Sequence, residues 1–180
     1  MDIVDCYFMI NQDDALRLLR QYVNDEKIIK HCIGVANIAF GIALKIKAKN
    51  FLEINPDRVK IAALLHDIGK FKDGIHEINT VEILKNEGLD YIAKIAMHGF
   101  AYEIFLLKGE ESSEYLPKNL ENKIVVLADM YYNQDEKRVS LDERLLDIKE
   151  RYRNDKDFMK VLVNGETRMR ILEDEIKLLM

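Results

Sequence analysis

The sequence predicts an all-α protein of about seven to nine helices, and three observations lead to that fold class. The composition is 48% hydrophobic and 33% charged, with only 8 Gly and 2 Pro among 180 residues. Leu, Ile, Lys and Glu, which suit helices, are abundant. Apolar residues recur at three- and four-residue steps, and no stretch alternates as a half-buried strand would. A chain of this length can bury one core without disulfides or a structural metal.

The first half of the chain carries clear helix starts. Residues 11–14 offer capping oxygens for a first short helix, and a second, longer helix is expected to begin near residues 24–25. A third begins at Asn55-Pro56, because proline suits the first helical position, and it ends near the doublet His66-Asp67. The apolar face of the second helix consists of Ile28, Cys32, Val35, Ala36, Ala39, Phe40 and Ala43.

The second half continues this pattern. Glycines are expected to end two of its helices, at Gly88 and Gly99. Ser140 and Glu143 have the spacing of a capping box at the start of another helix. The C-terminal segment is helical in pattern, with a break expected at Asn164-Gly165. The other expected elements are helices over 80–88, 89–99 and 119–134, with a polar loop over 108–118.

Charge and cysteine content limit the partners and the compartment. The net charge of −5, without a basic block, argues against nucleic-acid binding. Cys6 and Cys32 stand alone, which favours a reducing interior. The N-terminus lacks the basic region of a signal peptide, and no apolar run approaches the ~20 residues of a membrane span. We therefore expect a cytoplasmic protein with no membrane partner.

The histidines and one aspartate form the most informative pattern. His31, the doublet His66-Asp67, His76 and His98 all lie on or beside predicted helices, among apolar neighbours. Asp129 follows the apolar run "IVVLA". Taken singly, each histidine is more simply a core or cleft residue. Cys32 is more simply a small core residue, and Asp129 could cap a neighbouring helix or pair with an arginine.

Taken together, these residues predict a metal site. Burying several imidazoles and two carboxylates without a shared partner would cost several kcal/mol. Imidazole and carboxylate are ligands for divalent transition metals, here Fe, Mn, Zn, Ni or Co. Adjacent helical residues point about 100° apart, so His66 and Asp67 can share an ion only at a helix end or a distortion. We expect that ion in a crevice between helices.

These positions resemble the HD-domain metal-dependent phosphohydrolases. The signature of that family is an early histidine, a His-Asp doublet closing an apolar helix and a later aspartate, and it matches His31, His66-Asp67 and Asp129. The phrases "LLHDIGK" and "LADMYYN" are similar to the family's wording. The resemblance covers about residues 25–135. It implies a helical HD-domain bundle in which these four residues hold one metal ion.

A subset of the family binds two metals, and the chain resembles it as well. "HEINTVEIL", which begins at His76, and "AKIAMHG", which contains His98, match its two further histidines. Thr80 departs from the usual Gly or Ala. The resemblance implies a second metal held by His76 and His98, with Asp67 bridging the two ions. The alternative is a one-metal site in which these histidines contact phosphate or donate a proton.

The resemblance implies hydrolysis of a phosphoester or phosphoanhydride in a nucleotide-like substrate, through a metal-bound hydroxide. The small two-metal branch that splits dinucleoside tetraphosphates in bacteria is the nearest match. Asp67 and Lys70 are the catalytic candidates. Lys70 could bind a substrate phosphate or could be an ordinary cation at a helix C-terminus. Arg138 and Arg144 could make outer contacts with the substrate, but surface ion pairs are the simpler interpretation of both.

Two other function classes and the domain plan complete the expectations. The same ligands would serve a di-iron oxygenase, and a degenerate site would leave a non-catalytic binding module. The expected plan is one domain, with an N-terminal helix within 1–24 packing on the metal-binding core over 25–135. A helical C-terminal extension over 136–180 belongs to the same domain and could also build a homodimer.

Overall fold

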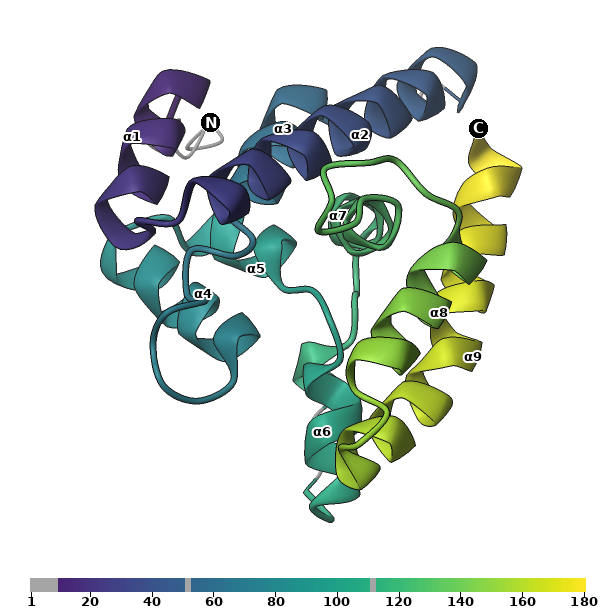
Figure 1. Cartoon of the computed structure of the whole chain (residues 1–180). Coiled ribbons are helices and arrows are strands. Elements are labelled where there is room, and N and C mark those ends of the chain that lie inside the picture. The colour runs from purple at the N-terminus through teal and green to yellow at the C-terminus, as the bar shows by residue number, and fades with distance from the viewer. Residues whose placement is uncertain (1–9, 51–52, 111–112) are drawn as a thin grey trace.

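The structure, a computed structural model, describes residues 10–50, 53–110 and 113–180. Within these ranges it contains nine α-helices, one short 3-10 helix (η1, Ser113–Tyr115) and no strand beyond an isolated bridge between Tyr132 and Arg138. The all-α prediction is therefore confirmed. Figure 1 shows the helices arranged around α7, with α8 and α9 side by side along one flank. Cys6 and the N-terminal stretch lie outside the described residues.

Two of the predicted helix starts have the expected caps. The side chain of Asn11 caps α1 (Gln12–Tyr22) by accepting a backbone N–H from the first turn. Asn55 accepts two N–H groups at the start of α3 (Pro56–Leu64), where Pro56 occupies the first turn. Between them, α2 (Glu26–Asn50) crosses the domain as its longest helix.

Helix α2 is long and apolar enough, by length and composition, to cross a membrane. That finding runs against the expectation that no segment would reach this threshold. In the structure α2 packs against α3 and α7, as a core helix does (Figure 1). The absence of a membrane partner stays a prediction. The fully buried residues of this helix are Val35, Ala39, Ala43 and Ile46, together with Cys32.

Three shorter helices follow. Helix α4 (His76–Asn86) begins four residues earlier than predicted, at His76 itself. Helix α5 (Asp90–Ala96) ends before Met97, so His98 lies just beyond it. Helix α6 (Ala101–Leu107) was not predicted. Gly88 and Gly99 both have positive φ, as expected of residues that end helices.

The C-terminal half contains α7 (Leu120–Met130), α8 (Leu141–Arg151) and α9 (Lys156–Leu179). The predicted capping box of Ser140 and Glu143 opens α8. The break predicted at residues 164–165 is wrong, because α9 runs through without interruption. A glycine is required at position 165 of this helix, because a Cβ would come within 2.5 Å of the Phe100 ring on the neighbouring segment. Close packing, not helix ending, explains this glycine.

Helix α9 is tied to the segment that carries His98. Arg168 on α9 donates to both carboxylate oxygens of Glu103 on α6, at 2.6 and 2.8 Å. It also donates to the carbonyl oxygen of Gly99 at 3.0 Å. The extension therefore fixes the backbone next to His98. The side chains that bury α9 in the common core are Val161, Leu162, Met169, Leu172 and Ile176.

Candidate metal centre

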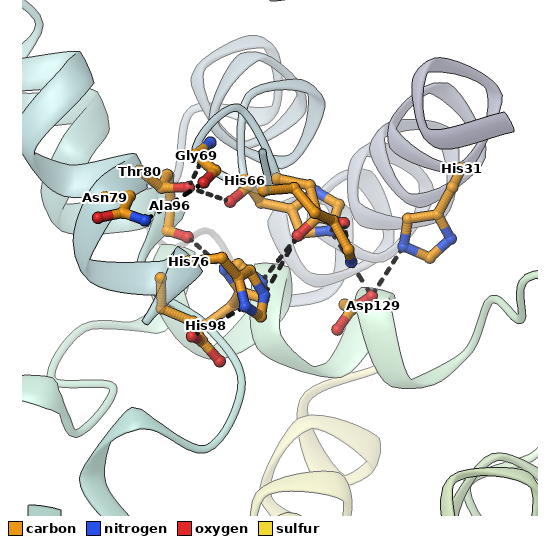
Figure 2. A network of polar contacts seen from close by, with 12 residues as sticks. His31, His66, Gly69, His76, Asn79, Thr80, Ala96, His98 and Asp129 are labelled. Atoms are coloured by element: carbon orange, nitrogen blue, oxygen red, sulfur yellow. Dashed lines mark hydrogen bonds and ion pairs between the residues drawn. The ribbon is translucent and has the colours of Figure 1, made fainter. Parts of the chain in front are cut away.

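The His66-Asp67 doublet lies in a tight turn directly after α3. The helix ends at Leu64, and residues 65–70 continue as consecutive turns. Thr80 on α4 fixes this turn, since its hydroxyl donates to the carbonyl of His66 at 2.8 Å and accepts the N–H of Gly69 at 3.1 Å (Figure 2). The departure from Gly or Ala at Thr80 therefore adds two hydrogen bonds beneath the doublet.

One group of candidate ligands, the first cluster, consists of His31, His66 and Asp129. His31 comes from α2 and Asp129 from α7, and they approach each other with His31 Nε2 3.0 Å from Asp129 Oδ1 (Figure 2). His66 Nε2 lies 3.6 Å from the same oxygen. The Nδ1 of His66 donates to the carbonyl of Ala63 at 2.7 Å, which leaves the lone pair on Nε2. Metal-binding histidines are commonly oriented in this way.

Asp67 lies at the centre of the site and is only 1% exposed. Its Oδ1 is 3.4 Å from the Nε2 atoms of both His76 and His98. Its Oδ2 accepts a hydrogen bond from Lys70 Nζ at 2.7 Å and lies 3.8 Å from His66 Nε2. One carboxylate therefore reaches histidines on both sides, as the predicted bridging role requires.

The second cluster consists of His76, Glu77 and His98. His76 is the first residue of α4, and the Nδ1 of His98 is hydrogen-bonded to the carbonyl of Ala96 at 3.1 Å. Glu77, which sequence analysis missed, is 4% exposed, and its Oε2 lies 3.2 Å from His76 Nδ1. A Cβ at Gly99 would collide with Glu77 Oε1, so the positive-φ glycine also makes room for this carboxylate. The signal in the sequence was an acidic residue directly beside a candidate ligand.

The carboxylates and histidines of the site shift each other's proton affinities. Burial alone would raise the pKa of Asp67, but His66, His98 and Lys70 outweigh it and hold that pKa well below its usual range. Burial is likewise outweighed at Asp129, where His31 and His66 lower the pKa. Burial lowers the pKa of His66, but Asp67 and Asp129 raise it above the ordinary value overall. The two aspartates are therefore ionised at neutral pH.

His76 and Lys70 respond to the same surroundings in opposite directions. Burial lowers the pKa of His76, and the neighbouring His98 lowers it further. Glu77 acts to raise this pKa but does not outweigh the other two effects. A neutral imidazole is the form that binds a metal. Burial also acts to lower the pKa of Lys70, but Asp67 outweighs it and raises that pKa. Lys70 therefore stays a cation beside the ligands.

The donor set fits a divalent cation. In the part of the chain that the structure describes, three overlapping groups have ligand atoms within 4.8 Å of one another, namely His31-His66-Asp129, His66-Asp67-His98 and His76-Glu77-His98. His66 Nε2 and Asp67 Oδ1 are buried and have no hydrogen-bond partner among the described residues. Buried atoms of this kind normally have a partner. Mixed imidazole and carboxylate ligands suit the transition metals expected from the sequence.

A cleft of about 380 Å³ opens onto these residues. Its lining includes Asp67, Lys70, His76, His98 and Asp129, so it contains most of the predicted site. Residues of α8 and α9 form part of its remaining wall. Arg144 on α8 is among them. It forms an ion pair with Asp147, as expected, but it is only 7% exposed, so the expected surface position is wrong.

Comparison with known proteins agrees with the residues at this site. The model of the HD domain family matches residues 28–134, and the chain belongs to that family. A relative from Methanocaldococcus jannaschii, named uncharacterized protein MJ0778, is 33% identical over 163 residues, which cover 86% of this chain and 95% of the relative. The likeness to this relative thus extends beyond the HD match. No solved structure matches the chain at a significant level.

Proposed function

We propose that this protein is a divalent-metal-dependent phosphohydrolase acting on a nucleotide-like phosphoester or phosphoanhydride. The observation that carries the proposal is the convergence of four histidines and two aspartates at one site, with unpartnered ligand atoms on His66 and Asp67. Four of these six residues, Asp67, His76, His98 and Asp129, line the cleft. Proteins of the HD domain family are generally metal-dependent hydrolases. Membership of the family therefore supports this chemistry, while the substrate is inferred separately.

The residues divide into two sets in this proposal. His31, His66, Asp67 and Asp129 would hold one cation, and His76 and His98 would hold a second that shares Asp67. When bound, such cations supply a water of lowered pKa and positive charge for the phosphoryl oxygens. The 3.4 Å distances from Asp67 Oδ1 to both His76 and His98 support a shared carboxylate.

Lys70 is the proposed phosphate contact. It lines the cleft, and its ammonium group lies 2.7 Å from Asp67 Oδ2. Because Asp67 keeps it protonated, it presents a fixed positive charge where phosphoryl oxygens would lie. Its partial exposure leaves room for such a contact beside its hydrogen bond to Asp67.

For the substrate we propose a nucleotide with more than one phosphate, with dinucleoside tetraphosphates as the first compounds to examine. The cleft volume of about 380 Å³ lies in the range of small-molecule sites. Cationic side chains lie along it at Lys70, Arg144 and Arg151. The cytoplasmic setting expected from the sequence is consistent with such a substrate and stays a prediction.

The experiment is a nucleotide panel assayed with Mn, Fe, Co or Ni, with release of phosphate or nucleoside monophosphate as the readout. We expect hydrolysis that depends on added metal and disappears in Asp67→Ala. Asp73→Ala is the matched control, because Asp73 is exposed and lies outside the cleft lining. Hydrolysis that survives Asp67→Ala would contradict the assigned centre. Oxygen uptake with the iron-loaded protein would instead favour the oxygenase alternative.

A further inference from the structure

Arg144 is a buried cation that the metal centre does not use. Its Nη1 donates to Asp147 Oδ2 at 3.0 Å, while its Nε is buried and has no partner among the described residues. The residue lines the same cleft as Asp67, His76 and Asp129. It lies on α8, beyond the residues matched to the HD domain.

An ordinary ion pair does not account for this burial. Asp147 is the only carboxylate bonded to Arg144 among the described residues, and its side chain is 40% exposed. Arg151 binds the same carboxylate, through Nη2 at 3.0 Å and Nε at 3.3 Å. A half-exposed pair of this kind contributes little, whereas burying a guanidinium is costly. Two guanidiniums on one carboxylate therefore leave one positive charge on the cleft wall without an ion-pair partner of its own among the described residues.

The same wall also offers an apolar surface. Tyr152 and Phe158 lie with ring centroids 4.4 Å apart, and Ile148 lines the cleft beside them. The guanidinium of Arg151 lies 5.6 Å from the Tyr152 ring centroid. A ligand that matched both features of this wall would carry an anionic group for the guanidiniums and a flat, partly apolar group for the aromatic rings. A nucleotide has both parts.

We propose that Arg144, assisted by Arg151, forms an anion subsite for a phosphate of the substrate other than the one at the metal centre. The inference rests on the proposed function and assigns the residues that bind the further phosphate of a nucleotide with two or more phosphates. Guanidinium groups bind phosphate through several parallel hydrogen bonds, and the free Nε of Arg144 is one such donor. Asp147 is the protein carboxylate that this phosphate would partly replace.

The test compares binding of α,β-methylene-ADP and AMP to the Mn-loaded protein by calorimetry. Arg144→Gln should weaken binding of the diphosphate analogue by roughly tenfold or more, since a charged hydrogen bond is lost. Binding of AMP should change by less than about twofold, because its single phosphate lies at the metals. Arg170→Gln is the matched control, since Arg170 forms surface ion pairs with Asp142 and Glu166. Manganese content should be equal in all three proteins.

A second variant predicts the opposite change and does not depend on the folding of the first. Asp147→Asn removes the carboxylate that competes for both guanidiniums, and Asp147 is exposed enough to tolerate the change. This variant should bind the diphosphate analogue several-fold more tightly than the wild type. Unchanged or weaker binding in Asp147→Asn would overturn the subsite.

The outcomes also separate the subsite from the proposed function. Equal loss of ADP-analogue and AMP binding in Arg144→Gln would place Arg144 at the reacting phosphate and contradict the inference. Hydrolysis of nucleotides with unchanged analogue binding in Arg144→Gln would refute the subsite and leave the function intact. Arg144-dependent binding without hydrolysis under any metal would refute the function and leave the subsite intact.

Discussion

The two clusters that meet at Asp67 are built by different parts of the fold. The first cluster, His31, His66 and Asp129, comes from α2, from the turn after α3 and from α7, which pack together in the core. The second cluster, His76, Glu77 and His98, comes from the first turn of α4 and the segment after α5. The His76 side chain is 34% exposed, whereas His66 is fully buried. Folding of the core therefore fixes the first cluster, while local polar contacts orient the second.

The largest effect is expected where the clusters join. Asp67→Asn should remove metal from both positions and lower activity by more than about 100-fold, since changes behind a ligand already cost about 10- to 100-fold. Metal content by mass spectrometry and the rate of nucleotide hydrolysis are the measurements. A variant that kept both its metal content and its rate of hydrolysis would show that Asp67 is not a ligand shared by the two metal positions.

The next effect separates the clusters. His66→Ala should abolish tight metal binding, because the residue lies between Asp129 and Asp67. His76→Ala should retain one ion in the first cluster and lose the second. Titration with Mn²⁺ followed by calorimetry gives the number of sites in each variant. One remaining metal site in His66→Ala and none in His76→Ala would contradict this prediction, because the second cluster would then bind metal without the first.

A smaller effect is expected at Glu77. Its carboxylate contacts His76 Nδ1 at 3.2 Å and accepts the backbone N–H of Phe100 at 3.4 Å. Glu77→Gln should weaken the second metal site by about 10- to 100-fold and leave the first unchanged. The control is Glu82→Gln, since Glu82 is an exposed residue of the same helix that pairs with Lys72. Equal metal affinities in the two variants would show that Glu77 does not orient His76.

The pH dependence of metal binding is expected to be the mildest effect. Burial lowers the pKa of His66, but Asp67 and Asp129 raise it overall, so the metal-free residue is partly protonated near neutral pH. A bound metal requires the neutral imidazole, so a proton must leave. Metal affinity should therefore rise between pH 6 and 8, by at most about tenfold per pH unit for this one proton. Competition with a metal indicator measures it, and a flat profile would contradict the assignment.

The stability of the metal-free chain should change with pH in the opposite direction. Because the folded-state pKa of His66 is raised, its stabilising contribution is complete below the ordinary histidine pKa of about 6.5. It is lost as the pH rises through the folded-state pKa. The lowered pKa of His76 acts in the opposite direction over the same pH range. Chemical unfolding of the metal-free His76→Gln variant at several pH values between 6 and 8 would therefore show the decline caused by His66.

The difference between the clusters also explains what the sequence could predict. His31, the doublet and Asp129 stand in long apolar segments, where a polar side chain is conspicuous and needs a partner. Periodicity and capping rules placed the helices that carry them. Glu77 and Arg144 look like ordinary charged residues of amphipathic helices, and only their burial in the folded chain distinguishes them.

The wrong and missing predictions also arise from contacts that form only in the folded chain. Local propensity predicts a helix break at Gly165, but this glycine instead lets the Phe100 ring pack against α9. Helix α6 is short, and its Glu103 is buried against Arg168 of the distant α9. Such contacts join residues far apart in the chain, so no local pattern in the sequence reveals them.

Anomalous diffraction from crystals of the Mn-loaded protein tests the central claim most directly, because it locates each ion. We expect one peak bound by His31, His66, Asp67 and Asp129, and a second near His76 and His98 that shares Asp67. A peak at the first position alone would reduce the second cluster to substrate or proton contacts. Manganese bound elsewhere, with none near His66 Nε2 and Asp67 Oδ1, would contradict the metal centre itself.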